Sequence, residues 1–444
     1  MSSSSPSNAA PSDPAPSDPA PSDAALWTNW AGSLRYSAAR RHEPASVDEL
    51  RAIVRGGTRV RALGSRHSFN TVADTDGDLV STAALPPVLR IAGDRRSVRV
   101  GGGLRYAAVA DHLWREGLAL ANLASLPHIS VAGAVATGTH GSGNRNQGLG
   151  SAVLALQLVT AEGELQELSR ADDAPDFPGS VVALGALGVV TELTLAVEPA
   201  FEVAQRVWLG LPLPRLAEQF EQVFAAAYSV SAFTTWGSGE AAIWLKQRTD
   251  APGGAPTVAG AVPATTGQHP IPGLPADPCT AQLGVPGPWH ERLPHFRPDF
   301  TPSRGDELQS EYLLPRERAA EGITRLRALG DRLAPVLHVS EIRTVAADDL
   351  WLSPAYGRDS VAFHFTWVAD AAAVRPVLAE VEAALRPLDA RPHWGKLATF
   401  SPEDLAVAYP RAGDFVRLAR RLDPEGRFLN RFVDETFAAV VVPR

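Results

Sequence analysis

The chain has 444 residues, of which 45% are hydrophobic, 20% are charged and ten are tryptophan, so it can bury a large core as a globular protein does. Its 49 acidic residues outnumber its 41 basic residues and give a formal charge of −8, which argues against binding of nucleic acid through phosphate contacts. The sequence has no run of about 18 apolar residues that would predict a transmembrane helix, and its single cysteine, Cys279, excludes an internal disulfide and a cysteine-rich metal site.

The first 25 residues consist almost entirely of Ser, Pro, Ala and Asp, and residues 10–23 repeat with a period of five. Such a segment buries too little apolar surface to offset the entropy of ordering, so we expect residues 1–25 to be disordered. The segment has no basic start and no apolar stretch, so it is not typical of a secretory signal. We therefore expect a monomeric cytoplasmic protein that does not contact a membrane.

Short helices and strands alternate between residues 44 and 200. Ser46 followed by Glu49 three residues later predicts a helix with a capping box over 44–54. A second helix is expected at 107–116, where Gly117 ends it. β-Branched and apolar runs predict strands at 60–63, 97–100, 153–160 and 189–197.

Two loops rich in Gly and Ser lie between these elements, at 64–68 and at 124–143. The backbone N–H groups of such loops can surround a pyrophosphate. Because Ile129, Val131 and Val135 look buried, we favour a bound dinucleotide over a flexible surface loop. The sequence contains no motif for a Rossmann NAD site, a P-loop, a nucleophile elbow or a zinc protease, and we expect no metal site.

Longer strands follow from residue 206 onwards. We expect strands at 241–248, 308–314, 337–345 and 360–368, and helices at 315–333 and 371–385. These elements together predict an α+β domain with helices on one side of an antiparallel sheet.

Two of these strands have a polar side. Period-two alternation places Glu341 and Arg343 on one face of their strand. In the next strand His364 and Thr366 lie opposite the aromatic residues. The polar face either meets solvent or lines a polar pocket, and the pattern alone leaves both open.

Several motifs resemble those of one flavoprotein family. They include RALGSRHSFN (61–70), NLASLPHISVAGAVATGTHGSG (122–143), SEIRTV (340–345), HWGK (393–396) and DPEGRFLNRF (423–432). The sequence resembles the FAD-binding flavoproteins of the vanillyl-alcohol-oxidase type, and within them the alditol oxidases, from residue 27 to the end. The resemblance implies an α+β, two-domain flavoprotein, with two small α/β subdomains that bind FAD and a cap domain built on an antiparallel sheet with flanking helices. We expect the FAD-binding domain at 26–205, the substrate domain at 206–418, and a segment at 419–444 that returns to the FAD domain.

The resemblance also implies where FAD binds. His67 would carry the flavin covalently, since a neutral imidazole is a competent nucleophile. His140 is the less favoured point of attachment. The residues expected to bind the cofactor are Gly64, Ser65, Arg66, His67, Ser68, Ser125, Ser130, Gly133, Gly138, Thr139, His140, Gly143, Gly188, Val189 and Asn430.

The implied reaction oxidises the terminal primary hydroxyl of a polyol, such as xylitol or sorbitol, to an aldehyde by hydride transfer to flavin N5, with O2 reduced to H2O2. The expected substrate-binding residues are Ser125, Gln309, Glu341, Arg343, His364, Thr366 and Lys396. These residue types exchange hydrogen bonds with an uncharged polyol. Arg343 and Lys396 would stabilise a developing alkoxide, and either Lys396 or Glu341 would act as the base.

One position bears on the electron acceptor. In the similar aldonolactone enzymes, the residue matched by Ala124 influences the access of oxygen to the flavin, where glycine favours oxidase behaviour and alanine can block oxygen. Despite Ala124, the resemblance to the alditol oxidases implies O2 as the acceptor.

Three other functions are open. An aldonolactone (gulonolactone-like) oxidoreductase would share the fold and the cofactor. A flavin-containing carbohydrate-binding protein without catalysis would not need the cations Arg343 and Lys396. A glycoside hydrolase would need two opposed carboxylates, for which only Glu341 and Glu311 are available in the polar strands.

Overall fold

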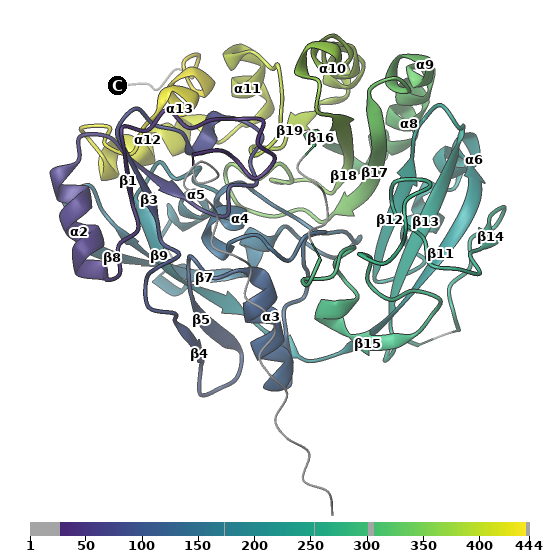
Figure 1. The fold of residues 1–444 in the computed structure, drawn as a ribbon, viewed down its shortest axis with the longest axis horizontal. Helices are drawn as coiled ribbons and strands as arrows, with labels where there is room; N and C mark the ends of the chain where they lie inside the picture. The colour runs from purple at the N-terminus through teal and green to yellow at the C-terminus, as the bar shows by residue number, and fades with distance from the viewer. Residues whose placement is uncertain (1–26, 173, 253, 301–305, 441–444) are drawn as a thin grey trace, which may run out of the picture.

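The chain forms four β-sheets with helices around them, within the residues that the structure, a computed structural model, describes: 27–172, 174–252, 254–300 and 306–440 (Figure 1). The tail at 1–25, for which we expect disorder, lies outside these residues. The sheets divide into a group built from the first half of the chain and one long sheet built mostly from the second half.

The first sheet has three parallel strands in the order β1–β3–β2. Its strands are β1 (Arg40–His42), β2 (Val60–Leu63) and β3 (Asp78–Ser81). Helix α2 (Val47–Gly56) connects β1 to β2, and Ser46 caps it by accepting a hydrogen bond of 3.2 Å from the backbone N–H of Glu49. The expected helix and its Ser46 cap are thus confirmed, but the reciprocal half of the capping box is not formed, because the Glu49 carboxylate accepts from the backbone N–H of Ala45.

The second sheet has five antiparallel strands in the order β4–β5–β9–β7–β8. The strands are β4 (Leu89–Ile91), β5 (Ser97–Gly101), β7 (Val153–Val159), β8 (Leu165–Ser169) and β9 (Val189–Ala196). The elements beside it are α3 (Tyr106–Arg115), α4 (Val131–Ala136), α5 (Phe177–Val181) and the small pair β6 (Leu118–Ala119) and β10 (Glu198–Pro199).

Helix α4 lies inside the segment 124–143, which we expected to be a loop throughout. That expectation is wrong for six residues. Val131, Ala134 and Val135 recur at helical spacing and are buried on one face, so packing stabilises a turn that contains Gly133 at its centre.

The long sheet is antiparallel, with the strand order β14–β11–β13–β12–β17–β18–β16–β19 and with β15 paired to β11. Its strands are β11 (Glu202–Pro212), β12 (Ser229–Thr234), β13 (Glu240–Arg248), β14 (Val262–Pro263), β15 (Pro286–Pro288), β16 (Glu307–Pro315), β17 (Leu337–Val345), β18 (Ser360–Val368) and β19 (Arg391–Pro392). The strands expected at 337–345 and 360–368 have these same bounds. The domain boundary expected between 205 and 206 falls within β11.

Helices cover one face of the long sheet (Figure 1). They are α6 (Leu213–Glu218), α7 (Phe220–Phe224), α8 (Ala319–Ala328), α9 (Gly330–Leu333) and α10 (Ala371–Leu385). Ile342, Phe363, Phe365 and Trp367 are fully buried in the core between this face and the helices. The alternate residues therefore lie on the opposite face, which confirms the α+β class and the helix-covered antiparallel sheet.

The single helix expected at 315–333 is wrong. The structure has a 3-10 turn at Arg316–Arg318, then α8, and then the short α9. Leu329 leaves the helical conformation with φ −93° and ψ 5°. Gly330 lies against the backbone of Trp236 and Gly237, where a Cβ atom would be 3.3 Å from the Trp236 carbonyl oxygen, so the chain turns at this close approach.

Of the C-terminal helices, α12 (Ala412–Leu422) and α13 (Arg431–Thr436) lie on the side of the first sheet and α2, and α11 (Pro402–Ala408) lies between α13 and α10 (Figure 1). The backbone N–H of Val60 donates a hydrogen bond of 2.8 Å to the carbonyl of Arg427. This end of the chain therefore packs on the strand that precedes the first Gly/Ser loop. Among the helices within the described ranges, none has the length and apolar character needed to cross a membrane.

Candidate active site

A deep cavity separates the first Gly/Ser loop from the helix-free face of the long sheet, and it encloses about 1920 Å³ including its open mouth. Its lining runs without a break from the Gly/Ser loop at 64–68 and the start of α4 to β16, β17 and β18, so the cavity joins a backbone-lined side to a polar side. The expected site residues that line it are Gly64, Ser65, Arg66, His67, Ser68, Ser125, Ser130, Gly133, Thr139, His140, Gly188, Gln309, Glu341, Arg343, His364, Thr366 and Lys396.

Four residues expected to bind the cofactor lie outside this lining, and each has a structural contact instead. Gly138 and Gly143 take positive φ angles of 71° and 140°, which L side chains rarely adopt. Val189 is buried in the core that includes Leu50. Asn430 caps α13 and donates to the backbone carbonyls of residues 71, 72 and 74 at 2.7–3.2 Å. The structure therefore does not bring these four residues to the cavity.

The first Gly/Ser loop and the start of α4 touch at backbone distance. Ser65 and Ser130 exchange two hydrogen bonds, from each backbone N–H to the other hydroxyl, at 3.1 and 2.9 Å. A Cβ atom on Gly64 would lie 2.5 Å from the Ser130 hydroxyl oxygen, and one on Gly133 would lie 2.8 Å from it. Both positions therefore require glycine, and the resulting wall presents backbone to the cavity, as a phosphate site needs.

His67 fits a covalent bond to a flavin. Its ring stacks on Trp30 at 5.1 Å between ring centroids. Its Nδ1 is buried and has no hydrogen-bond partner among the residues that the structure describes. Burial, reinforced by the nearby cationic groups His128, Arg105 and Lys396, lowers the pKa of His67 to about 3. The imidazole is therefore neutral and has an unpaired nitrogen at the edge of the cavity.

The opposite wall contains a buried pair of opposite charges. Arg343 donates to the carboxylate of Glu311, and its Nε lies 3.7 Å from a carboxylate oxygen of Glu341. His140 Nε2 lies 3.2 Å from Glu311 Oε1. Burial alone would raise the pKa of Glu311, but Arg343 and His140 hold it well below its usual range. Glu311, which we considered only as a possible hydrolase carboxylate, is thus the main counter-charge of Arg343.

Lys396 lies at the centre of the polar wall, next to β16 and β18. Its Nζ donates to Gln309 Oε1 and lies 3.4 Å from His364 Nε2, while His364 Nε2 lies 3.1 Å from Gln309 Oε1. Burial lowers the pKa of Lys396 to about 8 and that of His364 to about 3. His364 is therefore neutral, and Lys396 can exchange a proton near neutral pH.

A side chain of the first Gly/Ser loop region positions this lysine. Asn70 donates from its amide to the backbone carbonyls of Trp394 and Lys396, at 2.8 and 2.9 Å. The loop 393–396 is thereby tied to the cofactor side of the cavity.

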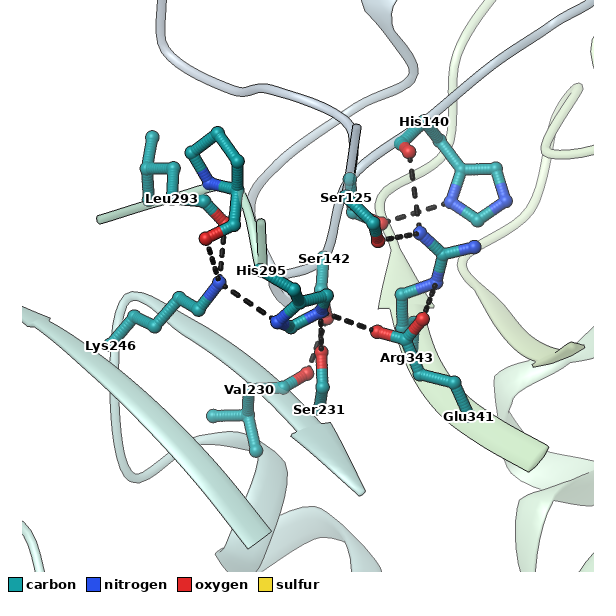
Figure 2. Close-up of polar contacts among 12 residues, drawn as sticks. Ser125, His140, Ser142, Val230, Ser231, Lys246, Leu293, His295, Glu341 and Arg343 are labelled. Carbon is teal, nitrogen blue, oxygen red and sulfur yellow. Dashed lines mark hydrogen bonds and ion pairs between the residues drawn. The ribbon is translucent and has the colours of Figure 1, made fainter. Parts of the chain in front are cut away.

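Glu341 on β17 has a partner that we did not expect. His295 Nε2 lies 2.8 Å from Glu341 Oε1, and Lys246 on β13 lies behind His295 (Figure 2). Burial would raise the pKa of Glu341, but Arg343 and His295 hold it below its usual range, so Glu341 is ionised. His295 stands in the motif PGPWHERLPHF, which singles it out in the sequence, but no spacing rule connects it to Glu341.

Two family models match the two sides of the cavity. The model described as "FAD binding domain" covers residues 38–169, and the model described as "D-arabinono-1,4-lactone oxidase" covers residues 304–436. The fold and the cavity therefore define an FAD-dependent oxidoreductase. An alditol oxidase of Streptomyces sp. (strain IKD472 / FERM P-14339) is 52% identical over 410 residues, which are 91% of this chain and 97% of that protein. The chain belongs to the alditol oxidase family, within the vanillyl-alcohol-oxidase type of flavoproteins.

More distant proteins share the same length and fold. An L-gulono-1,4-lactone dehydrogenase of Mycobacterium tuberculosis (strain ATCC 25618 / H37Rv) is 30% identical over 431 residues, which are 92% of this chain and 98% of that protein. The solved structure of cholesterol oxidase from B. sterolicum superposes with a TM-score of 0.75 at 16% identity, over 93% of this chain and 96% of that one. The latter likeness supports the fold alone.

Proposed function

We propose that the chain is an alditol oxidase, which oxidises the terminal primary hydroxyl of a polyol of the xylitol or sorbitol type to the aldehyde with O2 as electron acceptor. The observation that carries this proposal is the polar wall of β16, β17 and β18, where hydroxyl, amide and carboxylate groups lie beside Lys396 and face the cofactor side of the cavity. The alditol oxidase activity of the 52% identical relative supports the same conclusion.

The residue types of this wall suit a substrate with many hydroxyls. Each hydroxyl of a polyol can donate and accept one hydrogen bond or more. Ionised Glu341 accepts, Gln309 does both, and Ser125 and Thr366 complete the wall. A substrate that lacks one of these hydroxyls would leave a buried polar group unpaired, which gives the site its selectivity for polyols.

Lys396 is the better base of the two that we considered. A general base works best when its pKa lies near the working pH. The pKa of Lys396 is lowered by burial to about 8, whereas the pKa of Glu341 is held below its usual range by Arg343, so its carboxylate binds a proton weakly. We propose that neutral Lys396 takes the hydroxyl proton while Arg343, 3.4 Å from the Ser125 hydroxyl, offsets the negative charge on the substrate oxygen.

When bound, FAD would supply the redox chemistry, namely acceptance of a hydride from the carbinol carbon and transfer of its two electrons to O2, which takes up the hydride's proton and the hydroxyl proton to give H2O2. We propose that Gly64, Ser65, Ser130, Gly133 and Gly188 surround it. Ala124, which also lines the cavity, is the residue that we propose to control the approach of oxygen.

We also propose the division of the chain that the sequence suggested. Residues 26–205 bind FAD, residues 206–418 bind the substrate, and residues 419–444 return to the FAD side. The contact of Val60 with Arg427 supports the last assignment.

Mixing the purified protein with xylitol without oxygen should bleach its visible flavin bands, because the substrate then reduces the cofactor and nothing reoxidises it. The measurement is the absorption spectrum before and after mixing, and L-gulono-1,4-lactone is the matched comparison. Bleaching by the lactone but not by xylitol or sorbitol would replace the proposed function by that of an aldonolactone oxidoreductase. A protein that folds but has no flavin bands would contradict both.

The substitution His67→Gln should abolish covalent attachment, because the glutamine amide is no nucleophile. After acid precipitation, the wild-type pellet should stay yellow and the His67→Gln pellet should be colourless, with FAD in the supernatant. His140→Gln is the matched control, since His140 lines the same cavity. A yellow His67→Gln pellet together with a colourless His140→Gln pellet would move the attachment to His140.

A further inference from the structure

A chain of three buried side chains leads away from the substrate wall into the long sheet. Lys246 on β13, His295 in the segment after β15 and Glu341 on β17 follow one another (Figure 2). They are 1%, 4% and 5% exposed, respectively. Lys246 Nζ lies 3.2 Å from His295 Nδ1, and His295 Nε2 lies 2.8 Å from Glu341 Oε1. Of the three, Glu341 is the residue that we assign to substrate binding.

The acceptors around Lys246 fix the direction of these hydrogen bonds. Its Nζ faces the carbonyl oxygens of Leu293 and Pro294 as well as His295 Nδ1. An ammonium group has three N–H donors and no acceptor, so these three acceptors satisfy it. Ionised Glu341 can only accept, so the single proton of the neutral imidazole is on Nε2, from which it is donated to Glu341, and Nδ1 accepts from the ammonium form of Lys246.

The surroundings of His295 leave its ring no other orientation. The rings of Phe233 and Trp244 meet it edge-on, with centroids at 5.1 and 5.2 Å. Its backbone N–H donates to the carbonyl of Ser125 at 3.2 Å, which ties this segment to another residue of the substrate wall. The ring is thus held between apolar side chains, with Nδ1 toward Lys246 and Nε2 toward Glu341 and, at 3.4 Å, the Ser231 hydroxyl oxygen.

The charges around Lys246, His295 and Glu341 favour a neutral His295. Burial, together with Lys246 and Arg343, lowers the pKa of His295 to about 4, while Glu341 acts in the opposite direction. Burial lowers the pKa of Lys246 to about 7, and the other ionisable groups that act on it are Glu341, Cys279 and Arg343. Below about pH 7 the ammonium form of Lys246 therefore opposes a second proton on His295.

The amino-acid usage of the chain sets Lys246 apart. Of the 41 basic residues, 39 are arginines and two are lysines, Lys246 and Lys396. A guanidinium group is a flat fork that suits carboxylates, whereas a compact ammonium group suits three converging acceptors. The two lysines of the chain thus lie at the substrate wall and directly behind it.

We propose that Lys246 and His295 are positioning residues for the substrate: Lys246 keeps His295 neutral with its proton on Nε2, and His295 thereby holds Glu341 as an ionised acceptor for a substrate hydroxyl. The statement that Glu341 accepts from a substrate hydroxyl rests on the proposed function. The hydrogen-bond direction from Lys246 to Glu341 rests on the geometry alone.

The first test removes the donor to Glu341. His295→Ala should raise the KM for xylitol on the order of 10-fold to 100-fold with little change in kcat, because Glu341 loses the hydrogen bond from His295 that holds it in place for the substrate hydroxyl. His295→Gln keeps an N–H donor at the place of Nε2 and should restore most of the affinity. Arg248→Met, which removes a cation from the same strand as Lys246, is the matched control and should leave the KM within about twofold of the wild-type value.

The second test measures how the KM depends on pH, because loss of packing alone would not produce such a dependence. In Lys246→Met one cation that opposes protonation of His295 is gone, so the pKa of His295 should rise above about 4, while burial and Arg343 still hold it below its ordinary value. A protonated His295 would share the charge of Glu341 and weaken it as an acceptor. The KM of Lys246→Met, relative to wild type, should therefore rise as the pH falls through this range. The double variant Lys246→Met/His295→Gln should lose this dependence, since glutamine does not titrate.

The protonation of His295 can be read without turnover. In the holoenzyme labelled with 15N-histidine, the signals that disappear in His295→Gln should show one proton, on Nε2, below pH 7, and in Lys246→Met they should show two protons as the pH falls. A proton on Nδ1, or unchanged signals and KM values in Lys246→Met, would overturn the proposal while wild-type oxidation of xylitol left the proposed function standing. If the protein shows the expected signals but does not oxidise polyols, the proposed function is wrong and the hydrogen-bond direction from Lys246 to Glu341 still holds.

Discussion

Replacing Lys396 by methionine should leave FAD bound and reduce kcat by a factor on the order of 10² to 10⁴, the usual contribution of a general base. The side chain has nearly the same length and cannot take a proton. The rate of anaerobic flavin bleaching by xylitol measures the loss directly, since it reports the reductive step before oxygen reacts. The flavin spectrum of the variant before mixing is the control for cofactor binding. Near-normal bleaching would remove Lys396 from the reaction.

The pH profile separates the two roles that Lys396 can have. A base must be neutral, so the bleaching rate of the wild type should rise with pH and level off above the pKa of about 8. If the ammonium form were needed to stabilise an alkoxide, the rate would instead fall as the pH rises through the same value. In Lys396→Met the limb near pH 8 should vanish in either case. A rise that persists in the variant would identify another base.

Replacing Arg343 by methionine should destabilise the folded protein by about 3–5 kcal/mol, because Glu311 then becomes a buried charge without its main partner. Glu311 is 1% exposed and Arg343 is 6% exposed, so water screens neither of them. Urea unfolding of the holoenzyme, followed by circular dichroism and flavin fluorescence together, measures the loss. Turnover should fall as well, since Arg343 also faces the substrate wall.

The matched control for Arg343 removes both charges. The double variant Arg343→Met/Glu311→Gln removes the carboxylate that loses its main partner and should recover part of the lost stability, although Glu341 still loses its contact with Arg343 and His140 loses its contact with Glu311. If the double variant unfolds as easily as Arg343→Met, loss of packing by the arginine side chain explains the effect and the charge argument is wrong.

The strands of the substrate half follow from the sequence because one physical rule governs them. In a sheet with helices on one face, side chains alternate between the apolar core and the other face. Phe363, Phe365 and Trp367 therefore lie in the core, and His364 and Thr366 line the cavity, as their positions in the sequence indicate. The open question of a solvated face or a pocket is settled by the Gly/Ser loops, which lie across the cavity from this face.

The contacts of Glu341 and Arg343 could not be predicted in this way. Lys246 and His295 are 49 residues apart, and His295 and Glu341 are 46 residues apart. Three separate segments must pack together before these side chains meet, and no periodicity within one segment reports that packing. Helix α4 was not predicted for a related reason: the residues that stabilise it are small, and its helical face is defined by what it packs against.

The scarcity of lysine has a consequence beyond the cavity. The aldehyde that the proposed reaction releases is a reducing sugar, and the open-chain form of such a sugar condenses with neutral amines to form Schiff bases. Arginine, which provides 39 of the 41 basic residues, keeps its proton and does not form them. Lys246 is buried in the sheet, and Lys396 is enclosed in the cavity wall. The surface therefore offers that product no lysine to glycate, and Lys396, which we propose to be neutral where the aldehyde forms, is the lysine that the product meets.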